Sequence, residues 1–188
     1  MGLFDRLFGR YRKSGQSQPD QASSMNMGLR DLKTGALLDY DLQTWEVSGV
    51  YHYQWENNFT TKEYKLESGK EVIFLHLEED DKLECSIARK VPLNEIDPRL
   101  RRHIEKHDEP FEEIEYQGKT YYRTEENLGH FSEEGKSGSS KLVSWDFEDE
   151  SEEYFVNIER WGESDFEAAA GVYADVYEFS NFLPPSGH

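Results

Sequence analysis

The chain has 188 residues, a formal net charge of −18 and 36% apolar residues. Nucleic-acid phosphates attract clustered Lys and Arg, so this charge excludes nucleic-acid binding by the main body of the chain. Aromatic residues make up 14% of the sequence, which excludes a chain that is disordered throughout and provides enough large side chains for a core. No apolar run approaches the roughly 20 residues of a membrane span. The composition therefore predicts an acidic, cytoplasmic globular protein.

Residues 1–13 form a short basic segment with apolar residues at steps of three and four, which indicates one apolar face of a helix. We expect this face and its arginines to bind a membrane surface or a partner. The residues concerned are Leu3, Phe4, Arg6, Leu7, Phe8 and Arg10. The alternatives are a frayed terminus and a helix docked on the domain itself, because so short a segment binds a membrane weakly alone. Residues 14–26 are rich in Ser, Gln, Gly and Pro and predict a flexible linker.

Residues 27–96 have the pattern of a first β unit. Short β-branched and aromatic runs are broken there by Gly, Asp and Asn, which is typical of strands. Cys85, the one cysteine, alternates with polar residues between Leu83 and Ile87. A single thiol makes no internal disulfide. We interpret Cys85 as a small buried apolar side chain on a strand and not as a reactive thiol.

Residues 97–109 predict a connecting helix. Asp97 is a suitable N-cap, Pro98 suits the first helical position, and the helix ends before the second proline of this region. His103 and His107 lie four residues apart, a spacing that can hold zinc when further ligands are present. Because Arg and Lys surround this pair, we interpret the segment as a solvated basic helix, predict no metal site and consider contact with an anionic partner.

Residues 110–185 repeat the pattern of the first unit. Tyr40 and Trp45 match Tyr116 and Tyr121 at an offset of 76, and further along the offset becomes 81. A constant offset within a strand preserves which side chains point inward. The sequence therefore predicts a mainly β fold: two tandem, similar, small β units, each a bent sheet or small barrel, packed together and joined by one short helix.

The second half also carries the motifs of a known family. They are Tyr116-x-Gly118-x-x-Tyr121, Trp145-Asp146-Phe147, the run from Tyr154 to Gly162, and Asn181-Phe182-Leu183-Pro184. Over residues 28–184 the chain resembles the bacterial domain family of unknown function DUF4178. The resemblance implies a compact β-rich cytoplasmic domain of undetermined activity, with membrane-stress proteins and polyamine-synthesis enzymes among its gene neighbours. It supplies no catalytic residues.

Clusters of acidic residues stand at 78–81, 112–115 and 148–153. Clustered carboxylates can bind calcium, but the calcium-loop spacing with its central glycine is absent. We interpret the clusters as solvated turns, with a cation- or polyamine-binding surface as the alternative.

Glu159 and Arg160, followed by Trp161, are the strongest candidates in the sequence for catalytic residues. A glutamate beside a tryptophan can have a raised pKa and act as an acid, although pairing at a strand edge explains the same residues. Together with His130 they are the candidates for a cleft between the two units. The sequence contains neither the Gly-x-Ser-x-Gly nucleophile motif nor a phosphate-binding glycine loop.

We therefore expect a non-enzymatic accessory or binding protein without a cofactor, linked to membrane stress. A protein partner is expected, and residues 1–13 would recruit the protein to that partner or to the inner face of the membrane. The first alternative is an enzyme with a cleft between the two units. The second is an acidic protein that binds polyamines or other cations.

Overall fold

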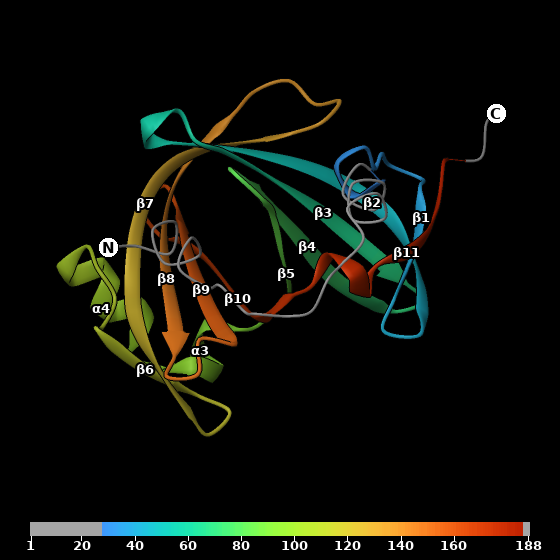
Figure 1. The fold of residues 1–188 in the computed structure, drawn as a ribbon. Coiled ribbons are helices and arrows are strands. Elements are labelled where there is room, and N and C mark those ends of the chain that lie inside the picture. Colours follow the sequence, from blue (N-terminus) through green and yellow to red (C-terminus); the bar gives the residue numbers. More distant parts are fainter. Residues whose placement is uncertain (1–27, 186–188) are drawn as a thin grey trace.

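The computed structural model describes residues 28–185, which form a mainly β structure (Figure 1). Its elements in chain order are β1 (Leu37–Tyr40), β2 (Gln43–Trp55), the 3-10 helix η1 (Glu56–Asn58), β3 (Thr60–Ser68), β4 (Glu71–Glu79), β5 (Leu83–Lys90), α3 (Leu93–Ile96), α4 (Leu100–His107), β6 (Glu113–Tyr116), β7 (Lys119–Glu133), β8 (Ser140–Asp149), β9 (Tyr154–Trp161), β10 (Asp165–Ala174), the 3-10 helix η2 (Val176–Glu178) and β11 (Ser180–Leu183).

Eight of these strands close a single antiparallel barrel. The strands pair in the order β2-β3-β4-β5-β10-β9-β8-β7, and β7 pairs back with β2. We call the β2–β7 and β5–β10 pairings the seams, because each joins the first half of the chain to the second. Strands β1 and β11 extend the sheet beyond β2, and β6 extends it beyond β7.

This pairing does not confirm the predicted pair of tandem units, because the halves share one continuous barrel. The two halves nevertheless have the same strand order, because β1 to β5 pair in sequence order and β6 to β10 do the same. Both long hairpins also contain a register shift at matching places, between Val47 and Gly49 and between Arg123 and Glu125. Such an irregularity bends a strand and changes which residues face inward, so both walls of the barrel curve at corresponding points.

The connection between the halves is two short helices and not the single helix expected at 97–109. Asp97 has extended backbone angles, φ −154° and ψ 122°, because the ring of a following proline disfavours the helical conformation. Its carboxylate accepts a hydrogen bond from the backbone N–H of Arg99 at 2.7 Å. Helix α4 therefore begins at Leu100, and it ends where Asp108 adopts a left-handed conformation, φ 61°.

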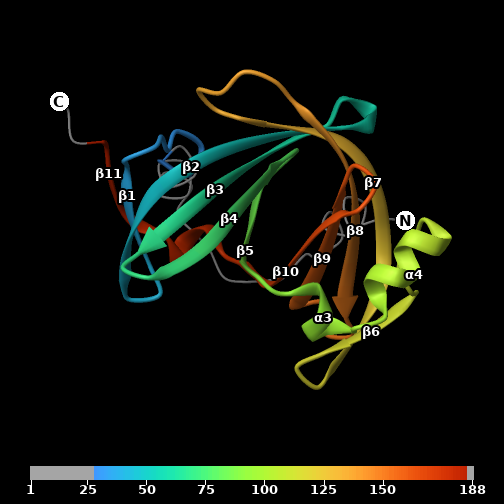
Figure 2. The same ribbon diagram turned by 180° about the vertical axis from the view of Figure 1, so that it is seen from behind.

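The buried apolar side chains form two clusters, each between one half of the barrel wall and the elements outside it. Figures 1 and 2 show β1 and β11 beside the first half of the wall, and α3, α4 and β6 beside the second half. The first outer cluster lies between the β2–β5 wall and the chain around β1, η2 and β11; it consists of Leu29, Leu32, Ala36, Leu38, Trp45, Val47, Val50, Tyr64, Leu66, Ile73, Leu75, Leu77, Leu83, Cys85, Ile87 and Phe179. The second outer cluster lies between the β7–β10 wall and α3, α4 and β6; it consists of Ile96, Leu100, Ile104, Ile114, Tyr121, Trp145, Phe147, Val156, Ile158, Phe166 and Ala168.

Each seam contains a glycine against which an aromatic ring packs. A Cβ atom at Gly129 would lie 2.5 Å from a ring carbon of Trp55. A Cβ atom at Gly171 would lie 2.2 Å from the carbonyl oxygen of Ile87 and 2.6 Å from a ring carbon of Phe155. Only glycine allows these close approaches, so the two residues permit the halves of the barrel to join.

Candidate functional site in the barrel interior

The strands that bury apolar side chains on their outer face turn polar side chains into the barrel. On β4, Leu75 and Leu77 belong to the first outer cluster, while His76 and Glu78 line a cavity on the opposite face. The same alternation is present on β3, β5, β8 and β9. Because the period of a strand is two residues, apolar outer faces require that the intervening residues face the interior. The interior of this barrel therefore carries carboxyl, amide and imidazole groups beside aromatic rings.

A cavity of about 110 Å³ occupies this interior, which corresponds to the volume of roughly four water molecules. Its polar wall includes Glu63, His76, Glu78, Asp146, Asn157 and Glu159. Some of these residues, with Tyr53, Ala88 and Ala169, also line a wider hollow that opens at one end of the barrel. The cavity thus has a route to solvent.

Glu78 is a carboxylate without a bonded partner among residues 28–185. It is 7% exposed, and no hydrogen bond or ion pair joins its side chain to a described residue. Burial and, to a smaller extent, the nearby negative charges of Glu84 and Glu125 raise its pKa to about 8. At neutral pH much of the Glu78 population therefore carries a proton.

Glu159 is the second inward carboxylate of this kind. Burial is again the main reason why its pKa is raised to about 8, Glu63 and Glu167 add to the effect, and Lys90 opposes it. No described residue donates a hydrogen bond to its carboxylate. A raised pKa was the property that made Glu159 a candidate, but its cause is burial inside the barrel and not the neighbouring Trp161.

Asp146 lines the same cavity and is held in place by amide groups. The Nδ2 atom of Asn157 donates to one carboxylate oxygen at 2.7 Å, and the Nδ2 atom of Asn127 donates to the other at 3.4 Å. Burial raises the pKa of Asp146, although both amides work in the opposite direction. Asp146 also contributes to the raised pKa values of Glu78 and Glu159, so the three carboxyl groups share one electrostatic environment.

Aromatic rings form another wall of the cavity. The rings of Tyr53 and Trp55 are stacked, with centroids 5.4 Å apart and an interplanar angle of 7°. Their polar atoms are already bonded: the Tyr53 hydroxyl donates to Glu63 at 3.3 Å, and the Trp55 indole donates to Thr61 at 3.0 Å. Their orientation is therefore fixed, and their π faces can contact a cation or an alkyl chain.

The four residues expected in a cleft lie on two different faces of the barrel wall. Glu159 and Trp161 line the hollow at the barrel opening, whereas His130 and Arg160 line a hollow on the outer surface. Arg160 donates to Asp108 at 3.1 Å and lies against the second outer cluster. The indole N–H of Trp161 is buried and has no acceptor among the described residues. The structure thus brings these residues together only in pairs.

Cys85 has the predicted structural role. Its side chain is 5% exposed in the first outer cluster, and its sulfur donates to the carbonyl oxygen of Ala174 at 3.2 Å. Burial raises the pKa of the thiol to about 12, so the thiolate that would be reactive is not formed at neutral pH.

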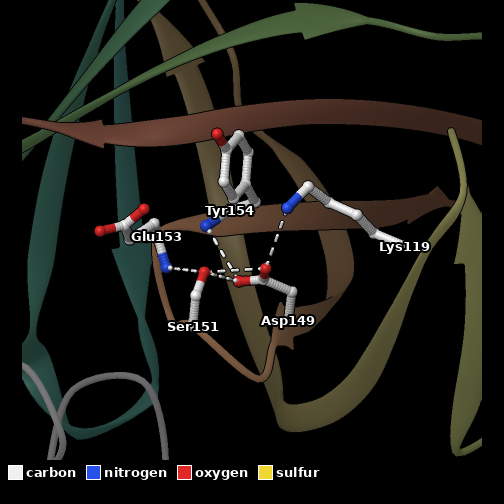
Figure 3. Close-up of polar contacts among 5 residues, drawn as sticks. All are labelled: Lys119, Asp149, Ser151, Glu153 and Tyr154. Carbon is white, nitrogen blue, oxygen red and sulfur yellow. Dashed lines mark hydrogen bonds and ion pairs between the residues drawn. The ribbon is translucent and has the colours of Figure 1, made fainter.

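The acidic cluster at 148–153 contains the residue that organises the β8–β9 turn (Figure 3). The Asp149 carboxylate accepts hydrogen bonds from the Ser151 hydroxyl at 2.8 Å and from the Tyr154 backbone N–H at 3.2 Å. The Nζ atom of Lys119 lies 3.5 Å from the Oδ2 atom of Asp149. The backbone N–H of Glu153 donates a hydrogen bond to the Ser151 hydroxyl oxygen. Although burial works to raise the pKa of Asp149, these bonds lower it overall. Asp149 thus acts as a turn-forming residue.

On helix α4, the rings of His103 and His107 lie 4.5 Å apart and His103 packs on Phe111. Residues 28–185 contain no group of three His, Cys, Asp or Glu side chains placed to hold a metal ion. No helix in that part of the chain is long and apolar enough to cross a membrane. The predicted amphipathic segment 1–13 and linker 14–26 lie outside the described residues.

Sequence reasoning missed most of the interior site. Glu78 was assigned to a solvated turn, and Asp146 was seen only as part of a family motif. In the sequence, each of them is an acidic residue that directly follows an apolar residue of a strand. That pattern is ambiguous, because such residues face water in most antiparallel sheets and face a cavity only when the sheet closes around them.

The comparisons with known proteins identify the family. Residues 33–175 match the family model described as "Domain of unknown function (DUF4178)". A protein of Aquifex aeolicus (strain VF5), named only as uncharacterized, is 27% identical over 184 residues, which cover 98% of this chain and 99% of that protein. No solved structure matches. The chain belongs to the DUF4178 family, as the resemblance implied.

Proposed function

We propose that this member of the DUF4178 family is a non-enzymatic binding protein that holds a small polar ligand inside its barrel. The observation that supports this proposal is the placement of both apolar clusters outside the barrel wall, around a cavity that carboxyl and amide groups line together with aromatic rings. An eight-stranded barrel has an interior that side chains can fill or that can hold one small ligand. Because the two apolar clusters that stabilise the fold lie outside the wall, the polar groups turned toward the cavity support a binding role.

Binding is favoured over catalysis by the position of the candidate residues. An enzymatic cleft would require His130 and Arg160 to act with Glu159 on one substrate, but the barrel wall separates them. The groups that line the interior are carboxyl groups, amides and aromatic rings. Such groups recognise a ligand by charge and hydrogen bonding.

The proposal includes the internal duplication suggested by the sequence. The shared strand order and the matching register shifts support two copies of one β unit that became halves of a single barrel. In that arrangement the cavity lies between the copies, where a ligand would contact both.

A second part of the proposal concerns recruitment. Residues 1–13 would bring the barrel to an anionic membrane surface or a protein partner as an accessory component. Co-sedimentation of the full-length chain and of a chain lacking residues 1–13 with vesicles rich in anionic lipid tests this role. We expect the shorter chain to stay in the supernatant, and equal partitioning of the two chains would contradict recruitment by this segment.

Fragment screening by protein-observed NMR tests the binding site itself. We expect polar fragments to shift the side-chain amide signals of Asn127 and Asn157, which surround the cavity. In an Ala169→Leu variant, whose larger side chain extends into the space that Ala169 borders, the same fragments should no longer cause these shifts. Ser139→Leu, at an exposed position, is the matched control. Fragments that bind only to the outer surface would contradict the proposal.

A further inference from the structure

We propose that the ligand of the barrel interior is an organic cation whose primary ammonium group is held among Glu78, Asp146 and Glu159. This inference rests on the proposed binding function and specifies the chemical class of the ligand. Three observations support it. They are the missing bonding partners of the interior glutamates, the neighbouring aromatic rings and the spacing of the acidic groups.

The two glutamates are the first argument. Glu78 and Glu159 face the cavity, and neither has a hydrogen-bond donor or an ion-pair partner among residues 28–185. Glu78 is buried and Glu159 is half-buried, and burying a carboxyl group without a partner is costly. The two groups stand on opposite halves of one barrel, and both can accept hydrogen bonds from a donor that enters the cavity.

The partners of Asp146 are the second argument. Asn127 and Asn157 already donate to Asp146, so its position is fixed before a ligand enters. An ammonium group has three N–H donors and no acceptor, and is therefore a suitable partner for carboxyl groups that line one cavity. A ligand with a carboxylate or phosphate would instead add a further negative charge to a desolvated cluster of carboxyl groups.

The aromatic wall indicates that the cation is organic. The stacked rings of Tyr53 and Trp55 border the same cavity, and such rings attract ammonium groups and pack against alkyl chains. The wider hollow at the barrel opening contains Phe74, Phe131 and Trp161, which continue the aromatic surface outward between charged side chains that include Lys65, Lys90 and Lys141. An alkyl chain attached to the ammonium group can therefore leave the inner cavity along rings.

The spacing of the acidic groups disfavours a metal ion. Within residues 28–185 no three His, Cys, Asp or Glu side chains converge as a metal site requires. A metal ion demands several oxygen ligands at about 2.0–2.6 Å. An ammonium group on a flexible chain bonds to oxygens at longer distances and does not need a closed coordination sphere.

The protonation state of the site gives the binding a signature. Because Glu78 and Glu159 have pKa values of about 8, both are largely protonated at pH 7. A bound cation favours their charged forms and lowers both pKa values. Binding of an ammonium group at pH 7 should therefore release protons, whereas binding to exposed surface carboxylates, already ionised, should release none.

Titration calorimetry of the full-length chain tests the inference with four matched probes: n-butylamine, 1,4-diaminobutane, n-butanol and butyrate. We expect the two amines to bind at pH 7, with an apparent enthalpy that differs between phosphate and Tris buffer because protons are released. Glu78→Gln and Glu159→Gln should each weaken binding at least tenfold. Glu113→Gln, at an exposed position on β6, should change it less than twofold.

Three outcomes would overturn the inference. The first is amine binding that survives both glutamine variants and disappears in 150 mM salt, which would indicate adsorption to the acidic surface. The second is binding of Ca²⁺ or Mg²⁺, and not of amines, that the variants abolish. The third is binding of butanol or butyrate that Ala169→Leu blocks, in which case the barrel would still be a binding site and only the ligand class would be wrong. If no probe binds and polar fragments avoid the interior, both the inference and the proposed function fail.

Discussion

The outer and inner faces of the barrel wall are built from the same strands but carry different kinds of side chain. On the outer face, large apolar residues such as Trp145 and Phe147 are completely buried beneath helices and flanking strands. On the inner face, the neighbouring Ser144 and Asp146 line the cavity. The difference indicates that the outer clusters, and not the groups around the cavity, stabilise the fold.

The first prediction compares adjacent residues on the two faces. Leu75 is fully buried in the first outer cluster, so Leu75→Ala should lower the free energy of unfolding by about 2–5 kcal/mol. His76→Ala, one residue further on and facing the cavity, should cost less than about 1 kcal/mol. Urea denaturation of both variants checks this comparison. A larger loss for His76→Ala would mean that the interior is the core of the protein.

The second prediction uses pH to separate the faces. The folded-state pKa of Glu78 is raised to about 8 from an ordinary 4.5, so folding favours the protonated group and stability falls as the pH rises from about 4.5 to 8. Glu78→Gln removes this loss. We expect it to raise the free energy of unfolding by about 2–3 kcal/mol at pH 9, allowing for the water that reaches the cavity, and to change it little at pH 4.

Glu159→Gln should behave in the same way, because burial raises its pKa to about 8 as well. Glu113→Gln serves as the exposed control and should have no pH-dependent effect. Thermal unfolding of the variants between pH 4 and 9 provides the measurement. Parallel stability curves for Glu78→Gln and the unmodified chain would show that Glu78 is not desolvated.

The third prediction concerns the β5–β10 seam. In Gly171→Ala the new Cβ atom would overlap the backbone of β5, so the variant should lose about 1–3 kcal/mol through displaced strands. Gly69→Ala is the control for a glycine with open space, where only the strain of φ +62° is expected. Amide hydrogen exchange should show faster exchange along β5 and β10 in Gly171→Ala. If exchange accelerates equally throughout the molecule, the substitution destabilises the whole barrel and not the β5–β10 pairing in particular.

The smallest effect is expected at the β8–β9 turn. Because hydrogen bonds hold the pKa of Asp149 below its ordinary 3.8, its stabilising contribution is present above that pH and is lost as the pH falls through the lowered pKa. Asp149→Asn should therefore cost about 1 kcal/mol at pH 7 and much less near pH 2. Chemical denaturation at the two pH values measures the difference. An equal cost at both would assign the loss to packing and not to charge.

The outer face could be predicted from the sequence, whereas the inner face could not. Alternation around Tyr64, Leu75 and Val156 correctly predicted strands with one buried face. Nothing in that pattern states whether the other face meets water or a cavity, because this depends on the pairing of β2 with β7 and of β5 with β10. Those pairings join residues more than 70 positions apart, and no local signal specifies them.

The candidate residues show the same limit. Glu159 was recognised from its neighbours in the sequence. Glu78 was interpreted as part of a solvated turn, and only the closed barrel shows that it faces the cavity. His130 and Arg160 were grouped with Glu159 by type, and only the alternation of their strands places them on the outer face. Local sequence therefore predicted which residues alternate, and the long-range topology decided which of them meet.

Carboxyl ¹³C NMR of Glu78 and Glu159 during titration with n-butylamine tests whether the barrel interior holds a cation. We predict that the side-chain carboxyl signals of both residues titrate near pH 8 without amine, shift as the amine is added, and then titrate at a distinctly lower pH. Unchanged signals from both carboxyl groups at saturating amine would show that the interior does not hold the cation.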